Sequence, residues 1–299
     1  MKALRFHSFG GPEVIALEDT AEPRAADGEV LVRVKACGLN FADTERRRGL
    51  YLASPLPETL GFEGAGVIEG TDQRVAFVAP RAHAELCVVP RARLISIPDQ
   101  MDLVTAAAFP VQWLTAWHVL HTVGRVRAGE TVLIHGAAGG VGQAVVQLAK
   151  ATGARVIATV SRDAKQRIVH ELGADEVHTR TPELELNGVD LLLEGIGKDI
   201  APSALKCLKP FGRWVTYGSA SGHLPPLDAE TLYEKSVSFS AYWLRTEHPR
   251  EVWQRAVEDV LAFLPRAKLE VTTAPLSDAA RWHRRLEGGL TTGKIVFTL

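Results

Sequence analysis

Alternating apolar and polar residues dominate the first part of the chain. In residues 30–36, Val30, Val32 and Val34 fall on one face of an extended strand. Similar short runs are separated by glycine and proline, and they cover residues 65–69, 74–78, 85–89 and 93–97. Regular short strands of this kind predict a compact β-barrel or sandwich over residues 1–112.

The pattern of apolar and polar residues changes from about residue 113. Continuous apolar strands now alternate with helical segments, as a parallel sheet buried on both faces requires. The expected strands are 131–135, 155–160, 189–194, 212–217 and 236–243, and the expected helices follow Gly139, end near 172–173 and cross 200–209. This βαβ series predicts a doubly wound α/β domain over residues 113–245.

The last stretch, residues 246–299, differs again. Its pattern predicts two amphipathic helices, 249–264 and 277–287, and a terminal strand, 294–299. A tail of helix, helix and strand can return to complete the first domain. A chain of 299 residues is long enough for two such domains.

Composition narrows the class of protein. Hydrophobic residues make up 46% and charged residues 23%, as in a soluble globular protein and unlike a disordered or collagen-like chain. The formal net charge of −1 supplies no basic field for general binding of nucleic acid or an anionic membrane. The chain shows no run of about 18 apolar residues and no apolar signal core at its start, so we expect no membrane span. Three widely separated cysteines favour a reducing compartment, and we expect a cytoplasmic protein.

A glycine-rich turn carries the strongest chemical signal. Residues 131–142 read TVLIHGAAGGVG, in which a buried strand leads through Ala137-x-Gly139-x-x-Gly142 into a helix. This is the context of a dinucleotide fingerprint, with alanine at the first glycine position. Gly139 lets the backbone approach a pyrophosphate, and Gly142 lets helix and strand pack closely. A tight turn without a ligand is the alternative, and the βαβ context favours cofactor binding.

The end of the second strand bears on which dinucleotide binds. NAD enzymes usually carry a carboxylate there to hold the ribose 2′-hydroxyl. This chain has Ser161, Arg162 and, one helical turn later, Lys165, which suit a 2′-phosphate. We interpret this loop as a binding site for NADPH. A solvated helix start is the alternative, and Asp163 keeps NADH open.

Several segments together resemble a known family, the zinc-free quinone oxidoreductase (zeta-crystallin-like) branch of the medium-chain dehydrogenase/reductase superfamily. They are GLNFAD at 38–43, RGLY at 48–51, GFEGAGV at 61–67, LTAW at 114–117, AAGGVG at 137–142 and TGKIV at 292–296. The resemblance spans almost the whole chain. It implies a GroES-like β-rich catalytic domain, made from residues 1–112 and 246–299, with a Rossmann domain of doubly wound parallel sheet inserted at 113–245.

Zinc-dependent members of the superfamily place a cysteine where this chain has Asn40 and a histidine where it has Phe62. Phenylalanine cannot ligate metal, and an asparagine amide is a poor partner for zinc. Glu63 remains, but one carboxylate is not a site. We therefore expect no metal. His118 and His121 form no ligand set with cysteine and are expected to be ordinary histidines.

The resemblance implies roles for individual residues. Asn40 is expected between nicotinamide and substrate, with its amide free to donate, and Tyr51 on the substrate side. The phenol of Tyr51 either donates to the acceptor oxygen or packs as an aromatic wall, and packing is slightly favoured. Asp43 is expected to order the local loop. The residues expected to contact the cofactor are Asn40, Thr115, Ala138, Gly139, Gly140, Val141, Ser161, Arg162, Lys165, Arg180, Gly218, Ser219, Trp243, Leu244 and Lys294.

Two of these assignments have equally simple alternatives. Arg180 stands where the family often has a tyrosine near the adenosine; it can stack or pair with a phosphate, or be an exposed loop charge. Lys294 lies among strand-forming neighbours, so a purely structural place is as strongly indicated as a cofactor contact. Thr115 is expected at the start of a long crossing helix.

The hypothesis is therefore NADPH-dependent reduction of a quinone or other α,β-unsaturated carbonyl by hydride transfer without metal. An enoyl-thioester or alkenal reductase is the enzymatic alternative, and a non-catalytic nucleotide-binding relative is the other. Residues 236–241 alternate small polar and apolar residues, as an edge strand would. Because an unpaired edge is an aggregation hazard, we expect a homodimer that pairs this strand, unless a loop or the helix 249–264 covers it.

Overall fold

The computed structural model describes residues 1–51, 55–181, 185–197, 200 and 205–299. Within them the chain forms two compact units. Unit 1 comprises Met1–Val111 and Leu269–Leu299, and unit 2 comprises Gln112–Lys268. The first boundary lies one residue from the predicted one.

The predicted second boundary, at 245/246, is wrong. Helix α8 (Arg250–Phe263) belongs to unit 2 and not to the returning tail. Its side chains pack inside unit 2: the indole N–H of Trp117 donates to Asp259 Oδ2 at 3.0 Å, and the Trp113 and Phe263 rings lie 5.7 Å apart. An amphipathic helix follows whichever apolar surface it buries, and the sequence does not say which one that is.

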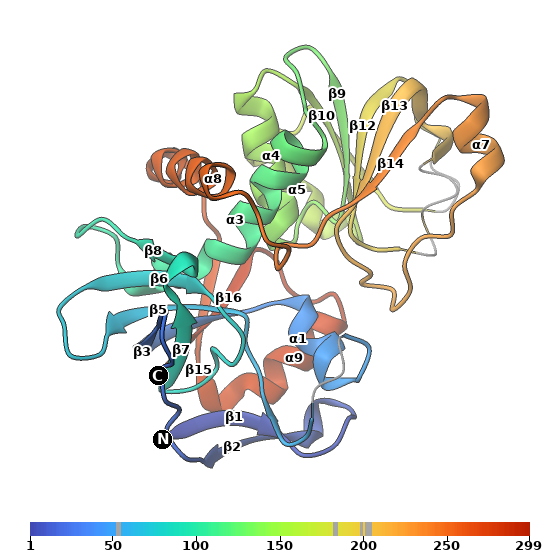
Figure 1. Ribbon diagram of the computed structural model, residues 1–299. Helices are drawn as coiled ribbons and strands as arrows, with labels where there is room; N and C mark the ends of the chain where they lie inside the picture. The colour runs from blue at the N-terminus through green and yellow to red at the C-terminus, as the bar shows by residue number, and fades with distance from the viewer. Residues whose placement is uncertain (52–54, 182–184, 198–199, 201–204) are drawn as a thin grey trace. The chain divides into compact units, whose positions relative to one another are not determined.

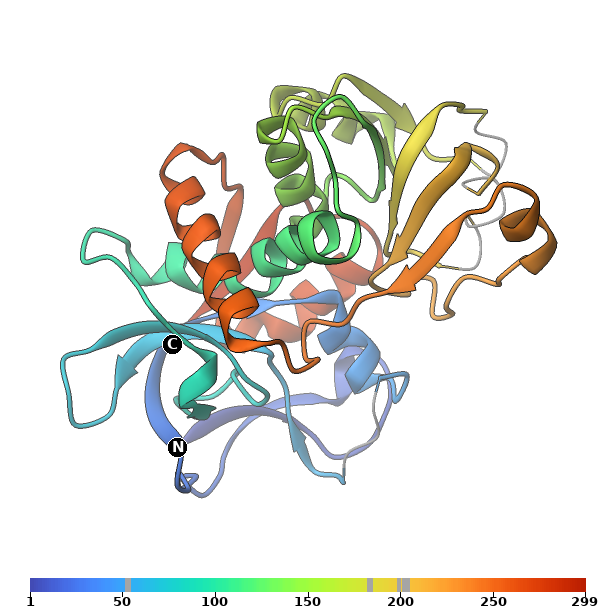
Figure 2. The ribbon, with the colours of Figure 1, turned by 45° about the horizontal axis from the view of Figure 1, so that its top comes forward.

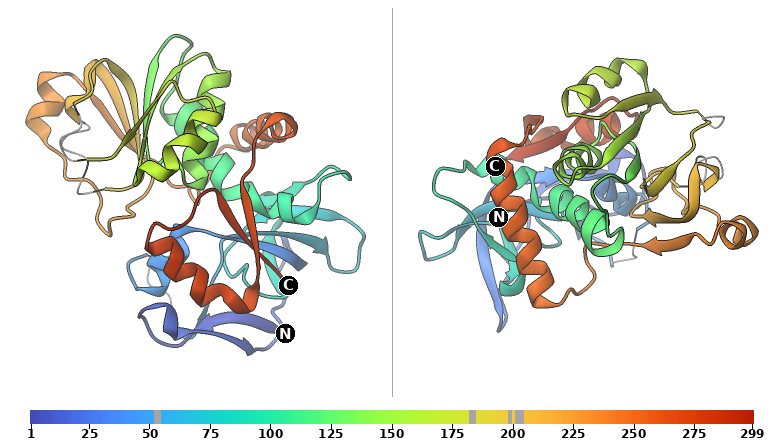
Figure 3. Two further views of the ribbon diagram at one scale, coloured as in Figure 1. Left: turned by 180° about the vertical axis from the view of Figure 1, so that it is seen from behind. Right: turned by 90° about the horizontal axis from the view of Figure 1, so that it is seen from above.

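Unit 1 is built around one long strand, β3 (Glu29–Leu39). It pairs antiparallel with β5 (Glu63–Ile68), β7 (Leu86–Pro90) and the C-terminal β16 (Lys294–Thr298). The sheet order is β15-β16-β3-β5-β6-β8, completed by β6 (Arg74–Val78), β8 (Leu94–Ser96) and β15 (Val271–Pro275). The end of the tail thus returns to the first sheet, as Figure 3 shows from behind.

A second, smaller sheet of unit 1 has the order β2-β1-β4, formed by β1 (Lys2–Phe6), β2 (Ile15–Asp19) and β4 (Glu58–Thr59). The helices of this unit are α1 (Phe41–Arg47), α2 (Leu103–Ala108) and α9 (Ala279–Glu287). Apolar side chains from β1, β3, β6 and β16, among them Phe6, Val32, Phe77 and Phe297, form one buried core. The sequence pattern missed the two short N-terminal strands and α1.

Unit 2 is a parallel sheet of order β11-β10-β9-β12-β13-β14, which confirms the predicted doubly wound parallel sheet. Its strands are β9 (Thr131–His135), β10 (Arg155–Val160), β11 (Glu176–Thr179), β12 (Val189–Glu194), β13 (Leu208–Thr216) and β14 (Ser238–Ala241). The ends of β9, β10 and β12 match the predicted ones, whereas β11 was missed. β14 is an edge strand, as expected, and Figures 1 and 2 show it outermost in the sheet.

The described part of unit 2 also contains helices α4 (Gly140–Ala151), α5 (Gln166–Glu171) and α7 (Ala229–Glu234). Helix α3 (Pro110–Trp117) crosses from unit 1 into unit 2 and continues as a π-helical segment, His118–Val123. Short 3₁₀ turns occur at Pro12–Val14, Arg91–Arg93, Asp163–Lys165, Leu264–Arg266 and Leu276–Asp278.

The helix expected over 200–209 lies partly outside the described residues, and its last two residues belong to β13 instead. No helix in the described parts of the chain is long and apolar enough to cross a membrane.

Candidate functional site

Asn40 begins helix α1 and is held by the loop around it. Its backbone N–H donates to Asp43 Oδ2 at 2.8 Å, and Asp43 Oδ1 accepts from the Gly61 N–H at 2.9 Å. Burial raises the pKa of Asp43, while the charge of His83 and the two backbone donors oppose that rise. Asp43 therefore ties the two loops together, in keeping with the ordering role expected of it.

The side-chain amide of Asn40 is bonded at both ends. Nδ2 donates to Glu63 Oε1 at 2.8 Å, and Oδ1 accepts from the Lys294 ammonium at 2.8 Å. Lys294 also donates to the Leu39 carbonyl at 3.1 Å and pairs with Glu63 Oε1. Lys294 and Glu63 therefore hold the amide, and Glu63 takes one of its two N–H groups; donation by the other to a substrate stays a prediction.

Lys294 and Glu63 are both buried, with side chains 2% and 0% exposed. The second oxygen of Glu63 accepts from the Val111 N–H at 2.7 Å. An ammonium has three donors, and three acceptors from unit 1 surround this one. A role for Lys294 in cofactor binding stays a prediction. A cofactor contact would have to replace one of these three hydrogen bonds.

Tyr51 lies next to Phe62, the residue that stands where zinc-dependent relatives have a histidine ligand. Its ring meets the Phe62 ring edge-on, with centroids 5.5 Å apart, and the Arg46 guanidinium lies 5.6 Å from the Phe62 ring centre. This contact supports a packing role for Tyr51. Arg46 is itself paired with the buried Glu58.

In unit 2 the glycine loop joins β9 to α4. Gly136 has a φ of +73°, in the left-handed region that favours glycine, and Gly139 caps the helix in extended conformation. A Cβ at Gly142 would lie 2.5 Å from the Ala137 Cα, so the expected role of Gly142 in close packing is confirmed. At Gly139 the same atom would meet only the Gly136 oxygen at 3.4 Å, which leaves its outer side open.

Gly140 has a constraint that the sequence did not reveal. A Cβ there would overlap the side-chain amide of Gln112, a buried residue of α3. Ala138 is also buried, and its carbonyl accepts from Gln143 Nε2 at 3.2 Å. The start of α4, with Val141, presents the N–H groups that a helix cannot satisfy internally, which suits a phosphate.

The residues expected at the adenosine end follow β10. Ser161, Arg162 and Lys165 are exposed or half-buried there. Asp163, the residue that kept NADH open, is bonded to the Thr179 hydroxyl and accepts from Gln166 Nε2 at 3.1 Å. Two protein groups therefore bond Asp163 Oδ1. The assignment of Arg162 and Lys165 to the ribose side stays a prediction from residue type.

A row of polar residues at the carboxyl edge of the sheet was missed. His135 Nδ1 bonds the Thr159 hydroxyl at 2.7 Å, and Glu194 accepts from the Gly197 N–H at 2.6 Å. Burial lowers the pKa of His135 to about 3 and raises that of Glu194, and the charge of Arg180 acts on both. Arg180 is half-buried and near enough to this row for its charge to lower both pKa values. Each residue ends a different strand, so only the sheet brings them together.

The remaining predicted cofactor residues are spread through unit 2. Gly218 and Ser219 follow β13, where a Cβ at Gly218 would lie 3.2 Å from the Gly195 oxygen. Trp243 is 40% exposed with the Arg245 guanidinium 5.2 Å from its ring, whereas Leu244 is buried. Thr115 is buried inside α3, which starts at Pro110, so its expected place at the helix start is wrong.

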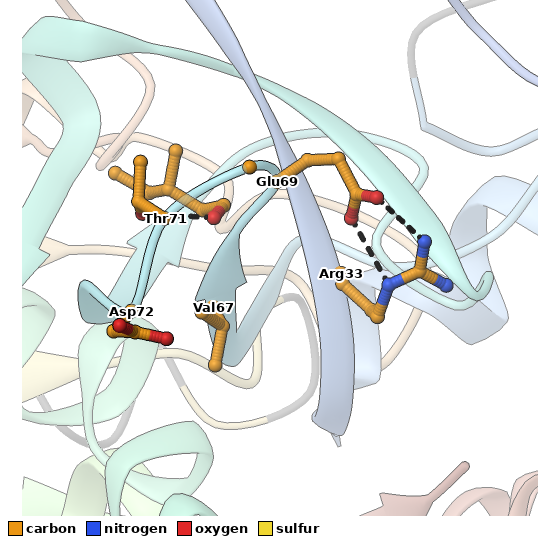
Figure 4. Close-up of a pocket in the computed structure, with 7 residues that line it drawn as sticks. Arg33, Val67, Glu69, Thr71 and Asp72 are labelled. Carbon is orange, nitrogen blue, oxygen red and sulfur yellow. Dashed lines mark hydrogen bonds and ion pairs between the residues drawn. The ribbon is translucent and has the colours of Figure 1, made fainter.

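One surface hollow lies away from these groups. It has a volume of about 320 Å³ and follows the turn between β5 and β6, lined by Arg33, Val67, Ile68, Glu69, Gly70, Thr71 and Asp72. Figure 4 shows its main feature, the Arg33–Glu69 ion pair, with N–O distances of 3.0 and 2.7 Å. Both partners are solvent-exposed, and none of the predicted site residues lines this hollow.

Comparison with known proteins gives a consistent result. Residues 26–80 match the model of the alcohol dehydrogenase GroES-like domain, and residues 140–262 match the zinc-binding dehydrogenase model. A quinone oxidoreductase of Pseudomonas aeruginosa is 34% identical over 99% of this chain and 98% of its own. A 2-haloacrylate reductase of Burkholderia sp. is 32% identical over 97% of this chain and 96% of its own. The structure of Escherichia coli quinone oxidoreductase complexed with NADPH superposes with a TM-score of 0.94, at 28% identity and full coverage of both chains.

The description of the second family model implies zinc, and the residues present do not fit it. Phe62 offers no ligand atom, and the Asn40 amide is bonded to Glu63 and Lys294. An ammonium, a positive charge, already sits against Glu63 Oε1. In the part of the chain that the structure describes, no group of three or more His, Cys, Asp or Glu side chains could hold a metal ion.

Proposed function

Because this chain belongs to the quinone oxidoreductase branch of the medium-chain dehydrogenase/reductase superfamily, we propose that it reduces a quinone or another α,β-unsaturated carbonyl with NADPH and without metal. The observation that carries the proposal is the environment of Asn40. Where zinc enzymes have a ligand, this chain has an amide held by a buried ammonium and a buried carboxylate. Such a site supplies a hydrogen-bond donor instead of a Lewis acid.

The loops of unit 2 fit NADPH. The N–H groups at the start of α4 and the open side of Gly139 suit the pyrophosphate, and Arg162 and Lys165 suit the 2′-phosphate. When bound, NADPH supplies the hydride that reduces the acceptor. Helix α4 contributes its positive dipole end to the phosphates.

The residues of unit 1 are assigned to the acceptor. A conjugated acceptor spreads the charge that develops during reduction, so a hydrogen-bond donor can stabilise it where an isolated carbonyl would need a metal. Asn40 Nδ2 is that donor in this proposal, and Tyr51 forms part of the wall of the acceptor site. A donor of this kind contributes up to about 2.7–4 kcal/mol in well-studied enzymes, and a delocalised acceptor should need less.

The test is an NADPH oxidation assay with quinones, enones, alkenals, enoyl thioesters and simple alcohols, for the protein and for Asn40→Ala. We expect turnover of the conjugated acceptors, no comparable oxidation of alcohols, and a lower kcat for Asn40→Ala. The metal-free part is tested by exhaustive chelation, which should leave activity intact. Consumption of no NADPH with any acceptor, better turnover of alcohols, or recovery of chelated enzyme by stoichiometric zinc would overturn the assignment.

An enoyl-thioester or alkenal reductase is the second candidate. The similarity to an enzyme named 2-haloacrylate reductase favours an activated C=C bond as the acceptor in this case. The same assay separates the candidates by their relative kcat/KM. A protein that binds NADPH and turns over none of these compounds would instead be the non-catalytic relative.

A homodimer through β14 belongs to the same proposal. Among the described residues this strand pairs only with β13, and its ends, Ser238 and Ala241, are exposed. Continuing the sheet across a two-fold axis would satisfy its outer N–H and C=O groups. Light scattering should give twice the chain mass, and Ala241→Arg should weaken the association by placing like charges near the axis. A monomer at micromolar concentration would contradict this proposal.

A cytoplasmic location and the lack of general nucleic-acid binding also remain predictions. They rest on the net charge of −1 and on three cysteines without a disulfide pattern. Fractionation of cells and a binding titration with duplex DNA at low salt would test them.

A further inference from the structure

A buried ion pair holds the one side chain on which the proposed chemistry depends. We propose that Lys294 and Glu63 are positioning residues that fix and polarise the Asn40 amide for the acceptor. This proposal rests on the proposed function. They act through Asn40, and neither contacts the acceptor itself. Their contacts with the amide are 2.8 Å each.

The ion pair decides which way the amide faces. An asparagine amide can turn over, exchanging its oxygen and its nitrogen with almost no change in shape. An ammonium only donates and an ionised carboxylate only accepts, so Oδ1 must face Lys294 and Nδ2 must face Glu63. With either charge missing, a single partner fixes the amide, so the turned-over orientation, which points the N–H donors away from the acceptor, costs less free energy.

One N–H of Asn40 stays available in the fixed orientation. Nδ2 carries two hydrogens, and Glu63 Oε1 takes one of them at 2.8 Å. Nδ2 also donates to the Gly38 carbonyl at 3.4 Å, a long and weak contact. A stronger acceptor, such as the oxygen of a carbonyl that is gaining charge, can replace that contact.

The ammonium also makes this N–H a better donor. Lys294 withdraws electron density from the amide through Oδ1, and charge-assisted hydrogen bonds are stronger than neutral ones. Linked hydrogen bonds polarise one another, most of all where water is excluded. The burial of both charges places the chain Lys294–Asn40–acceptor in that setting.

The backbone leaves room for the pair. Gly38 on β3 lies between Glu63 on β5 and Lys294 on β16, and β3 pairs with both strands. A Cβ at Gly38 would lie 2.6 Å from Glu63 Oε1 and 2.6 Å from Lys294 Cε. Three neighbouring strands therefore hold the amide, which is the rigid support that a precisely oriented donor needs.

Lys294→Met removes the charge at nearly constant length. We expect kcat to fall roughly 10–100-fold, as for displaced catalytic groups, while the Kd for NADPH changes less than about twofold. Lys294→Arg should recover part of the loss, because it restores a donor-only cation. Lys2→Met, which removes an exposed lysine of unit 1, is the matched control and should keep its kcat.

The decisive measurement is a double-mutant cycle on kcat with Asn40→Ala. If Lys294 acts through Asn40, adding Lys294→Met to Asn40→Ala should change kcat by less than about twofold. An equal loss in both backgrounds, an unchanged kcat in Lys294→Met, or a Kd for NADPH that rises in step with the loss would overturn the proposal.

Stability must be followed in parallel, because Lys294→Met leaves Glu63 buried without its cation. If a thermal melt shows that this variant is unfolded at the assay temperature, Glu63→Gln/Lys294→Met replaces it in the cycle, with the same expected outcomes. Absence of turnover in the unmodified protein would refute the proposed function. Turnover there without coupling to Asn40 would refute the positioning role alone.

Discussion

The two candidate sites of this protein, one in each unit, are built in opposite ways. In unit 2 the phosphate loop is a continuous stretch of backbone, in which glycines leave room and a helix start supplies N–H groups. In unit 1 the working group is one side chain, held by partners 23 and 254 residues away along the chain. A backbone site can be recognised from adjacent residues, whereas a side-chain site depends on which strands pair.

The units also treat buried polarity differently. Unit 1 buries a full ion pair around Asn40. Unit 2 buries His135 with a pKa lowered to about 3 and Glu194 with a raised pKa, so both lean toward their neutral forms. The first arrangement orients a donor by charge, and the second avoids the cost of burying unpaired charge.

The largest effect should come from Gly142→Val. Its side chain would start 2.5 Å from the Ala137 backbone, which cannot yield as a flexible side chain does. We expect the free energy of unfolding to fall by about 3 kcal/mol, with loss of NADPH binding. Urea denaturation and a fluorescence titration measure the two quantities.

Gly139→Ala is the matched control for that variant. Its Cβ would lie 3.4 Å from the Gly136 oxygen, and its φ of −80° suits any residue. Stability should therefore change by less than about 0.5 kcal/mol, while the added methyl obstructs the pyrophosphate and weakens NADPH binding. If both variants lowered the free energy of unfolding equally, Gly142 would not be the packing residue and Gly139 would not serve cofactor approach alone.

Arg162→Ala tests the choice of cofactor. Losing a partner of the 2′-phosphate should weaken NADPH binding by about 1.5–3 kcal/mol, as for hydrogen bonds to charged groups, and leave NADH binding nearly unchanged. Arg167→Ala, which removes an exposed cation of α5, is the control. Equal affinities of the unmodified protein for NADPH and NADH would mean that this loop does not bind the 2′-phosphate.

His135 predicts a dependence of stability on pH. Its folded pKa of about 3 lies below the ordinary value of 6.5, so the unfolded chain binds the extra proton between these limits. His135 therefore stabilises the fold fully above about pH 6.5, and this contribution falls by up to about 1.4 kcal/mol per pH unit as the pH drops toward 3.

The measurement compares urea unfolding of the protein and of His135→Asn at several pH values from 7 to 4. The unmodified protein should lose more stability on acidification than the variant does. Parallel curves would mean that His135 is protonated in the folded state as readily as in the unfolded chain.

The smallest effect should come from Tyr51→Phe. If Tyr51 forms a wall through its ring contact with Phe62, removal of the hydroxyl should change kcat by less than about threefold. Tyr51→Ala removes the ring and should raise KM for the acceptor. A tenfold or larger fall in kcat for Tyr51→Phe would assign proton delivery to the phenol.

Much of unit 2 and of its cofactor loop could be predicted from the sequence. Strands β9, β10 and β12 have the predicted bounds, because strands of a parallel sheet covered on both faces are mostly apolar and stand out from the turns and helices between them. The close packing at Gly142 followed from residue type at a strand-to-helix turn. The poor fit to zinc at Asn40 and Phe62 also follows from side-chain chemistry alone.

Tertiary structure decided the rest. It assigned α8 to unit 2, brought the charge of Arg180 within range of His135 and Glu194, and gave the Asn40 amide its two charged partners. None of these contacts joins neighbours in the chain. Backbone preferences act between adjacent residues and are written in short patterns, whereas the meeting of Asn40, Glu63 and Lys294 exists only once β5 and β16 have paired with β3.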